Sequence, residues 1–167
     1  GAIPEVGLHA FKKKELFPLD VRRRAEAFEM GEGPEDWYRG GDSGMVYLPG
    51  GKYLTGTLFL KSNVTLHLAA AATILGSPEP DHYSTAVERC GFVRETAIDR
   101  CLIYAAGAKN ITINGRGTID GQGRSFPLRR TDGRPVIRPM LIRLVECQNV
   151  SVEGVTLTNA AAWCFHL

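Results

Sequence analysis

A short unit led by asparagine recurs along the chain, and this repeat limits the possible folds more than any other feature. The units are KSNVTLHL around Asn63, AKNITING around Asn110 and CQNVSVEG around Asn149. Each has a short apolar strand before the asparagine, a second strand directly after it, and a third beyond a corner of small residues. Repetition of this kind indicates structural units stacked on one another.

Three short strands per unit predict a parallel β-helix, in which each unit is one coil. A sandwich is disfavoured because its strands are longer and joined by hairpins. In a β-helix, equivalent residues of successive coils lie about 4.8 Å apart. Asparagine tolerates the left-handed backbone of a sharp corner, and stacked asparagines can bond one another. The expected second and third strands are 64–66, 111–113 and 150–152, then 73–75, 118–120 and 156–158.

The predicted organisation is an all-β domain over residues 45–167, preceded by an N-terminal extension or cap over residues 1–44. The domain would contain about three to four coils. Within the cap, Leu19–Met30 reads as a short helix. The spacing between the asparagines is unequal, so loops are expected to leave the stack at Pro78–Arg100 and Arg124–Arg138, where they could line a cleft.

Four segments in order carry a resemblance to a known family: MVYLPGGKYLTGTLFLKSNVTLHLAAAATILGS, NITINGRGTIDGQG, RPMLIRLVECQNVSVEGVTL and NAAAWCFHL. From Met45 to Leu167 the chain resembles the polygalacturonase-type glycoside hydrolases of family 28, which have the pectin-lyase-like, single-stranded right-handed parallel β-helix. The resemblance implies hydrolysis of pectin, or a related acidic polysaccharide of the cell wall. It also implies an inverting mechanism with one carboxylic acid and one carboxylate.

The chain departs from the family pattern in two places. Phe17–Gly44 does not resemble the usual opening of the family. The family's catalytic signatures (Asn-Thr-Asp, a paired Asp-Asp, Gly-His-Gly and Arg-Ile-Lys) lie downstream of the segment that NAAAWCFHL resembles, and none occurs here. The catalytic residues are therefore expected beyond Leu167, and this chain alone is predicted to be inactive.

Aligning the strands that precede the asparagines yields three candidate substrate-binding residues. Matching Leu102–Tyr104 with Leu141–Arg143 stacks Tyr104 on Arg143, and His166 takes the same position on the next coil. These side chains would form an outward ladder, although they could equally be ordinary outward residues of a sheet. Strand alternation predicts the inward residues Trp163, Phe165 and Leu167.

Arginines Arg129, Arg130 and Arg138 are further candidates for binding substrate. They lie in an expected loop, where they could form a wall of the cleft and hold sugar carboxylates through a bidentate fork, or simply be solvated. Asp120 in GTIDGQG is expected to make a turn, because aspartate before glycine at a corner usually does so.

The expected partner is a uronic-acid-rich polysaccharide, with no cofactor and no metal. A net charge of +2 does not argue for nucleic acid or a membrane. Missing C-terminal coils, or another chain, are expected to cover the open end of the stack. Two alternatives stay open: a non-catalytic β-helix that binds carbohydrate or acts as an adhesin, and a polysaccharide lyase. The exact polymer, and cleavage from within or from an end, stay open too.

No signal-peptide pattern is seen at the N-terminus, while the resemblance implies an extracellular or periplasmic protein. Cysteines Cys101, Cys147 and Cys164 lie in or beside apolar runs. We expect buried free thiols there and no disulfide framework.

Overall fold

Strands make up most of the chain that the computed structural model describes, which is residues 39–40, 43–85, 100–127 and 137–167. The elements, in chain order, are β1 (Arg39–Gly40), β2 (Ser43–Leu48), β3 (Gly51–Thr55), β4 (Leu58–Phe59), β5 (Val64–Leu68), β6 (Ala72–Gly76), η1 (Pro80–His82), β7 (Cys101–Ala106), β8 (Lys109–Gly115), β9 (Thr118–Asp120), η2 (Gly123–Ser125), β10 (Met140–Val145), β11 (Gln148–Glu153), β12 (Thr156–Thr158) and β13 (Phe165–His166). The predicted helix over Leu19–Met30 lies outside the described residues.

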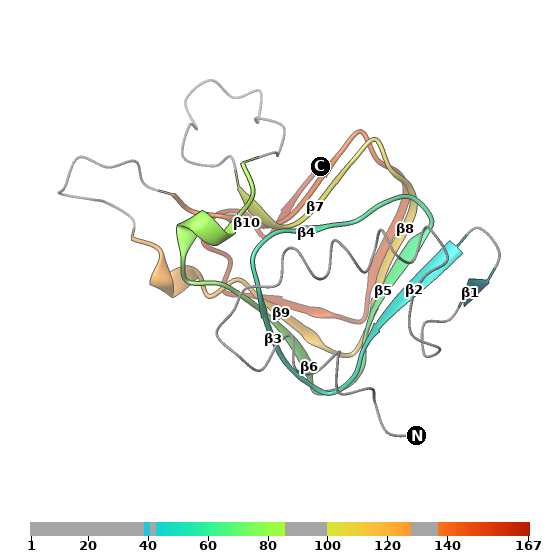
Figure 1. Ribbon diagram of the computed structural model, residues 1–167, viewed down its shortest axis with the longest axis horizontal. Helices are drawn as coiled ribbons and strands as arrows, with labels where there is room; N and C mark the ends of the chain where they lie inside the picture. Colours follow the sequence, from blue (N-terminus) through green and yellow to red (C-terminus); the bar gives the residue numbers. More distant parts are fainter. Residues whose placement is uncertain (1–38, 41–42, 86–99, 128–136) are drawn as a thin grey trace.

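Three sheets form the sides of a stack of coils, seen end-on in Figure 1. Sheet A has the strand order β1-β2-β5-β8-β11, sheet B has β12-β9-β6-β3 and sheet C has β13-β10-β7-β4. The described pairs are parallel apart from β1 with β2. Each coil supplies one strand to each sheet in turn. The fold is therefore the right-handed parallel β-helix that the repeat and the resemblance predicted.

The asparagines turn the corner from sheet C into sheet A, as predicted. Asn63, Asn110 and Asn149 have φ angles of 62°, 57° and 53°. Asn110 Nδ2 donates to Asn63 Oδ1 at 2.7 Å, and Asn149 Nδ2 donates to Asn110 Oδ1 at 2.7 Å. The amides thus form a continuous hydrogen-bonded ladder that holds successive coils in register. Strands β2 and β3 precede the first of these asparagines, and the asparagine repeat therefore did not include them.

Glycine occupies the corner from sheet A into sheet B after β8 and after β11. Gly115 has a φ of 117°, and a Cβ there would collide with the backbone carbonyl of Leu68 on the preceding coil. Gly154 occupies the equivalent corner one coil later, with a φ of 74°. Only a residue without a side chain lets the coils approach this closely.

The core lies inside the three sheets and is built from equivalent residues of successive coils. In sheet A, Val46 pairs in register with Leu66, which pairs with Ile113. In sheet B, Ile74 pairs with Ile119, and both side chains are fully buried. Because strand residues alternate between faces, the residues between these positions point away from the core.

The three described cysteines are free, but only one is fully buried. Cys101 is buried, Cys147 is half-buried and Cys164 is exposed. The prediction of a buried thiol was therefore wrong for Cys164, which lies on a bend just before β13, the edge strand of sheet C. In the part of the chain that the structure describes, no helix is long and apolar enough to cross a bilayer.

Candidate functional site

One residue from each strand of sheet C forms a ladder along the stack. Phe59 pairs in register with Tyr104, Tyr104 with Arg143, and Arg143 with His166. The predicted stacking of Tyr104, Arg143 and His166 is therefore confirmed. Phe59 is a fourth member that sequence reasoning missed, although it is the last residue of the apolar pair before Leu60 and could have been found by extending the alignment one coil back. We call these four residues the sheet-C ladder.

The sheet-C ladder lies on the face of the sheet that points away from the core. Ile103 and Ile142, the preceding residues on β7 and β10, belong to the main core. Tyr104 instead belongs to a second cluster with Cys101 and Met140, against which Phe59 packs. The rings of Phe59 and Tyr104 meet edge to face, with centroids 5.7 Å apart. The beginning of the ladder is therefore a fixed aromatic pair.

Arg143 is the unusual member of the ladder. Its side chain is 2% exposed. Its buried Nε and Nη1 atoms have no hydrogen-bond partner among the described residues. Burying a charge without a partner costs several kcal/mol, so such a group is expected to meet an anion.

The thiol of Cys101 does not supply that anion. Burial raises its pKa to about 12, and the positive charge of Arg143 lowers it only in part. At neutral pH the thiol is therefore protonated and uncharged. Arg143 has a neutral cysteine on one side and the rings of Tyr104 and His166 on the neighbouring strands. This surrounding suits the recognition of a negatively charged group.

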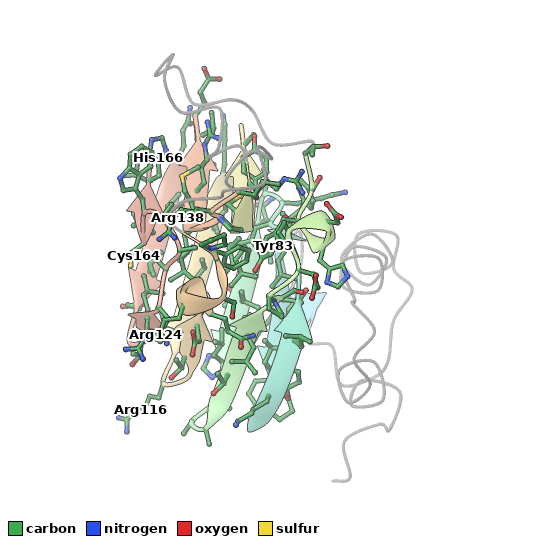
Figure 2. The ribbon with its side chains drawn as sticks, turned by 90° about the vertical axis from the view of Figure 1, so that its left-hand side faces the viewer. Tyr83, Arg116, Arg124, Arg138, Cys164 and His166 are labelled. Carbon is green, nitrogen blue, oxygen red and sulfur yellow. The ribbon has the colours of Figure 1, made fainter. Side chains whose placement is uncertain are left out.

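The other end of the ladder is an aromatic surface that differs from the prediction. The rings of Trp163 and His166 stack with centroids 5.2 Å apart and an interplanar angle of 16°, and Trp163 is 37% exposed. The inward placement of Trp163 was wrong, because the chain bends at Cys164 and strand alternation begins only at Phe165. Figure 2 shows His166 and Cys164 at the left-hand edge of the stack.

Phe165 and Leu167 are also more exposed than predicted. Phe165 pairs in register with the core residue Ile142, yet it is 40% exposed, and Leu167 is 79% exposed. The physical reason is that β13 is the edge strand of sheet C, so no further described strand covers these positions. Phe165 is therefore aligned with core residues of the preceding coils, but it is not buried as they are.

Of the three arginines predicted to form a wall of the cleft, Arg138 lies within the described residues. Arg138 donates from Nη1 to the carbonyl oxygen of Phe126 at 2.8 Å, which connects the segment before β10 to the end of η2. Arg129 and Arg130 lie outside the described residues. Asp120 makes the predicted turn: its Oδ1 accepts from the backbone N–H of Gln122 at 2.8 Å, and its Oδ2 accepts from Asn159 at 3.2 Å.

Comparison with known proteins shows which family this chain resembles. The family model described as glycosyl hydrolases family 28 matches residues 46–167. A probable polygalacturonase of Vitis vinifera is 33% identical over 72% of this chain and 26% of its own length. An exo-poly-alpha-D-galacturonosidase of Dickeya chrysanthemi is 34% identical over 70% of this chain and 20% of its own length.

Two solved structures show the same architecture. A putative glycosyl hydrolase from Parabacteroides merdae aligns over 96% of this chain and 69% of that one, with 27% identity and a TM-score of 0.69. A family 28 exopolygalacturonase of Yersinia enterocolitica aligns over 70% of this chain and 29% of that one, with 25% identity and a TM-score of 0.57. The chain spans about a quarter or less of the length of the two curated relatives. It belongs to glycosyl hydrolase family 28.

Proposed function

We propose that this chain is the N-terminal part of a hydrolase that cleaves glycosidic bonds in polygalacturonate or a closely related uronic acid polymer. Membership of family 28 supports the reaction, and the curated relatives named above are polygalacturonases or galacturonosidases. The observation that carries the substrate class is Arg143, a buried guanidinium with unpaired donors on the outer face of sheet C. A polymer with one carboxylate per sugar supplies the missing anion.

The exposed end of the sheet-C ladder is proposed as the surface that positions the polymer. Trp163 and His166 offer stacked rings at its exposed end, against which the apolar face of a sugar can pack. Arg143 lies one strand further along, about 4.8 Å away. A chain laid across the rings therefore brings its carboxylates toward the guanidinium, where a charge-assisted hydrogen bond is strong. Arg129, Arg130 and Arg138 stay candidates for further contacts with the polymer.

The chemical step is proposed to use groups outside this chain. Inverting hydrolysis needs a carboxylic acid that protonates the leaving oxygen and a carboxylate that activates water, with the two groups about 6.5–9.5 Å apart. The family's acidic signature motifs follow the segment that resembles NAAAWCFHL, so we expect both groups in coils beyond Leu167. The chain of 167 residues is accordingly expected to be inactive alone.

The test compares this chain with the longer product of its gene. Release of reducing ends from polygalacturonate is expected from the longer protein and not from the chain alone. In the longer protein, Arg143→Lys is expected to raise KM for polygalacturonate, since lysine keeps the charge but loses the planar guanidinium. Arg116→Ala is the matched control, because Arg116 is an exposed corner arginine away from sheet C.

Each other outcome has a distinct meaning. Polymer binding without turnover by the longer protein would indicate a non-catalytic binding module. Turnover by the chain alone would show that its acid and base lie within these residues. An unchanged KM in Arg143→Lys would remove Arg143 from the substrate site.

A further inference from the structure

A second register of outward side chains runs along sheet A. Tyr47 pairs with His67, His67 with Asn114, and Asn114 with Glu153. The preceding residues on the first three strands, Val46, Leu66 and Ile113, form part of the core or pack against it. We call Tyr47, His67, Asn114 and Glu153 the sheet-A column; it shares no strand with the sheet-C ladder.

The contacts within the sheet-A column hold its aromatic end in place. The rings of Tyr47 and His67 stack with centroids 5.5 Å apart and an interplanar angle of 12°. Nδ1 of His67 lies 2.8 Å from Oδ1 of Asn114, in a hydrogen bond that fixes the imidazole. Tyr47 is nevertheless 53% exposed. The ring of Tyr47 is therefore open to solvent, while its stacking on His67 fixes its orientation.

The two outward rows of sheet A that include the column consist mainly of polar residues. Two residues earlier on the same strands, a parallel row begins at Met45 and continues with the hydroxyl side chains of Thr65, Thr112 and Ser151. Glu153 is the charged member of the two rows, which contain no lysine or arginine. A polyanion lying on these two rows would meet the carboxylate of Glu153 and no cation from either row. A membrane or an apolar protein surface would have to desolvate the hydroxyls and the amide.

We propose that the sheet-A column binds a neutral polysaccharide. An open aromatic face suits the apolar side of a pyranose ring, and the amide and carboxylate beyond it can bond sugar hydroxyls. The rungs repeat about every 4.8 Å along the stack, so an extended glycan lying along the column can contact several of them at once. The site requires no catalysis and does not rest on the proposed hydrolase activity.

Affinity electrophoresis of the full chain tests this proposal. The probes are gels that contain galactan, arabinan or xyloglucan, with polygalacturonate as the anionic comparison. Retardation by at least one neutral polymer is expected. Tyr47→Ala should weaken it about tenfold, which corresponds to about 1.4 kcal/mol, whereas Tyr47→Phe should keep it because the ring remains. Lys52→Ala, an exposed substitution on sheet B, is the control and should change nothing.

Thermal unfolding of each variant verifies that the fold is kept, which is expected because Tyr47 is exposed. Failure of all three neutral polymers to retard the chain would overturn the proposal, as would full retardation of Tyr47→Ala. Retardation by polygalacturonate that depends on Tyr47 would overturn the assignment to a neutral glycan. A change of oligomeric state in Tyr47→Ala would show that a second copy of the chain occupies this face.

Discussion

Asn110 lies between Asn63 and Asn149 and bonds both of them, donating to the first and accepting from the second at 2.7 Å in each case. Its backbone is left-handed, with a φ of 57°. Asn110→Ala removes both bonds and places a Cβ-bearing residue without a polar side chain in that conformation. We expect a loss of about 2 kcal/mol in the free energy of unfolding, measured by urea denaturation.

Asn110→Gly separates the two contributions. Glycine also lacks the amide but adopts a positive φ at little steric cost, so it should be less destabilising than alanine. Equal losses for the two variants would mean that the hydrogen bonds alone account for the effect. No loss in either would show that the asparagine ladder does not stabilise the stack.

Gly115→Ala is expected to be among the most damaging single-methyl changes in the described chain. The new Cβ would meet the backbone of Leu68, at a φ of 117°. Steric strain and the clash together predict a loss of about 3 kcal/mol or more in unfolding free energy. Gly107→Ala is the matched control: its φ is 61°, but nothing lies within 4 Å of the added Cβ. That variant should lose only about 1 kcal/mol.

The repeat made the register of the coils predictable, but it could not show what surrounds each side chain. The corner from sheet C into sheet A is marked in the sequence by Asn63, Asn110 and Asn149. Aligning the strands that precede these asparagines was therefore enough to predict that Tyr104 stacks on Arg143. Strands β2 and β3 come before the first asparagine, so the repeat did not reveal them.

The exceptions at the candidate site arise from tertiary context. Trp163 breaks the alternation because of a bend that no residue pattern marks. The burial of Arg143 is set by neighbours distant in sequence, so an outward strand position alone could not reveal an unpaired guanidinium.

Arg143→Met distinguishes a binding residue from a structural one. If the guanidinium is buried without an anion, an apolar side chain of similar length should stabilise the chain by about 1–3 kcal/mol. The measurement is urea denaturation of the chain alone, without polysaccharide. A loss of about 3–5 kcal/mol would instead show that Arg143 has an anionic partner within the protein and is held for stability.

Alkaline pH should destabilise the fold through Cys101. Burial raises the pKa of this thiol from 9.0 to about 12, and Arg143 offsets part of the rise. The folded chain therefore keeps a proton that the unfolded chain loses above pH 9. The stabilising contribution is complete below pH 9 and is lost as pH rises toward 12, by at most about 1.4 kcal/mol per pH unit.

Urea denaturation at pH 8, 9 and 10 measures this loss, and Cys101→Ala should flatten it while lowering stability at pH 8 through the cavity it creates. Burial raises the pKa of the Tyr83 phenol as well, so both proteins should still lose stability above pH 10. An identical pH dependence in wild type and Cys101→Ala would contradict the assignment to this thiol.

The edge of sheet C predicts how the chain behaves in solution. Trp163 and Phe165 are 37% and 40% exposed beside β13, whose outer backbone edge has no described partner strand. Edges of this kind pair with other chains unless further coils cover them. Size-exclusion chromatography of these 167 residues should show self-association that increases with concentration. Phe165→Lys should reduce it, because a charge on an edge strand opposes pairing, whereas Lys52→Ala on sheet B should not. A stable monomer at all concentrations would show that this end needs neither further coils nor a partner chain.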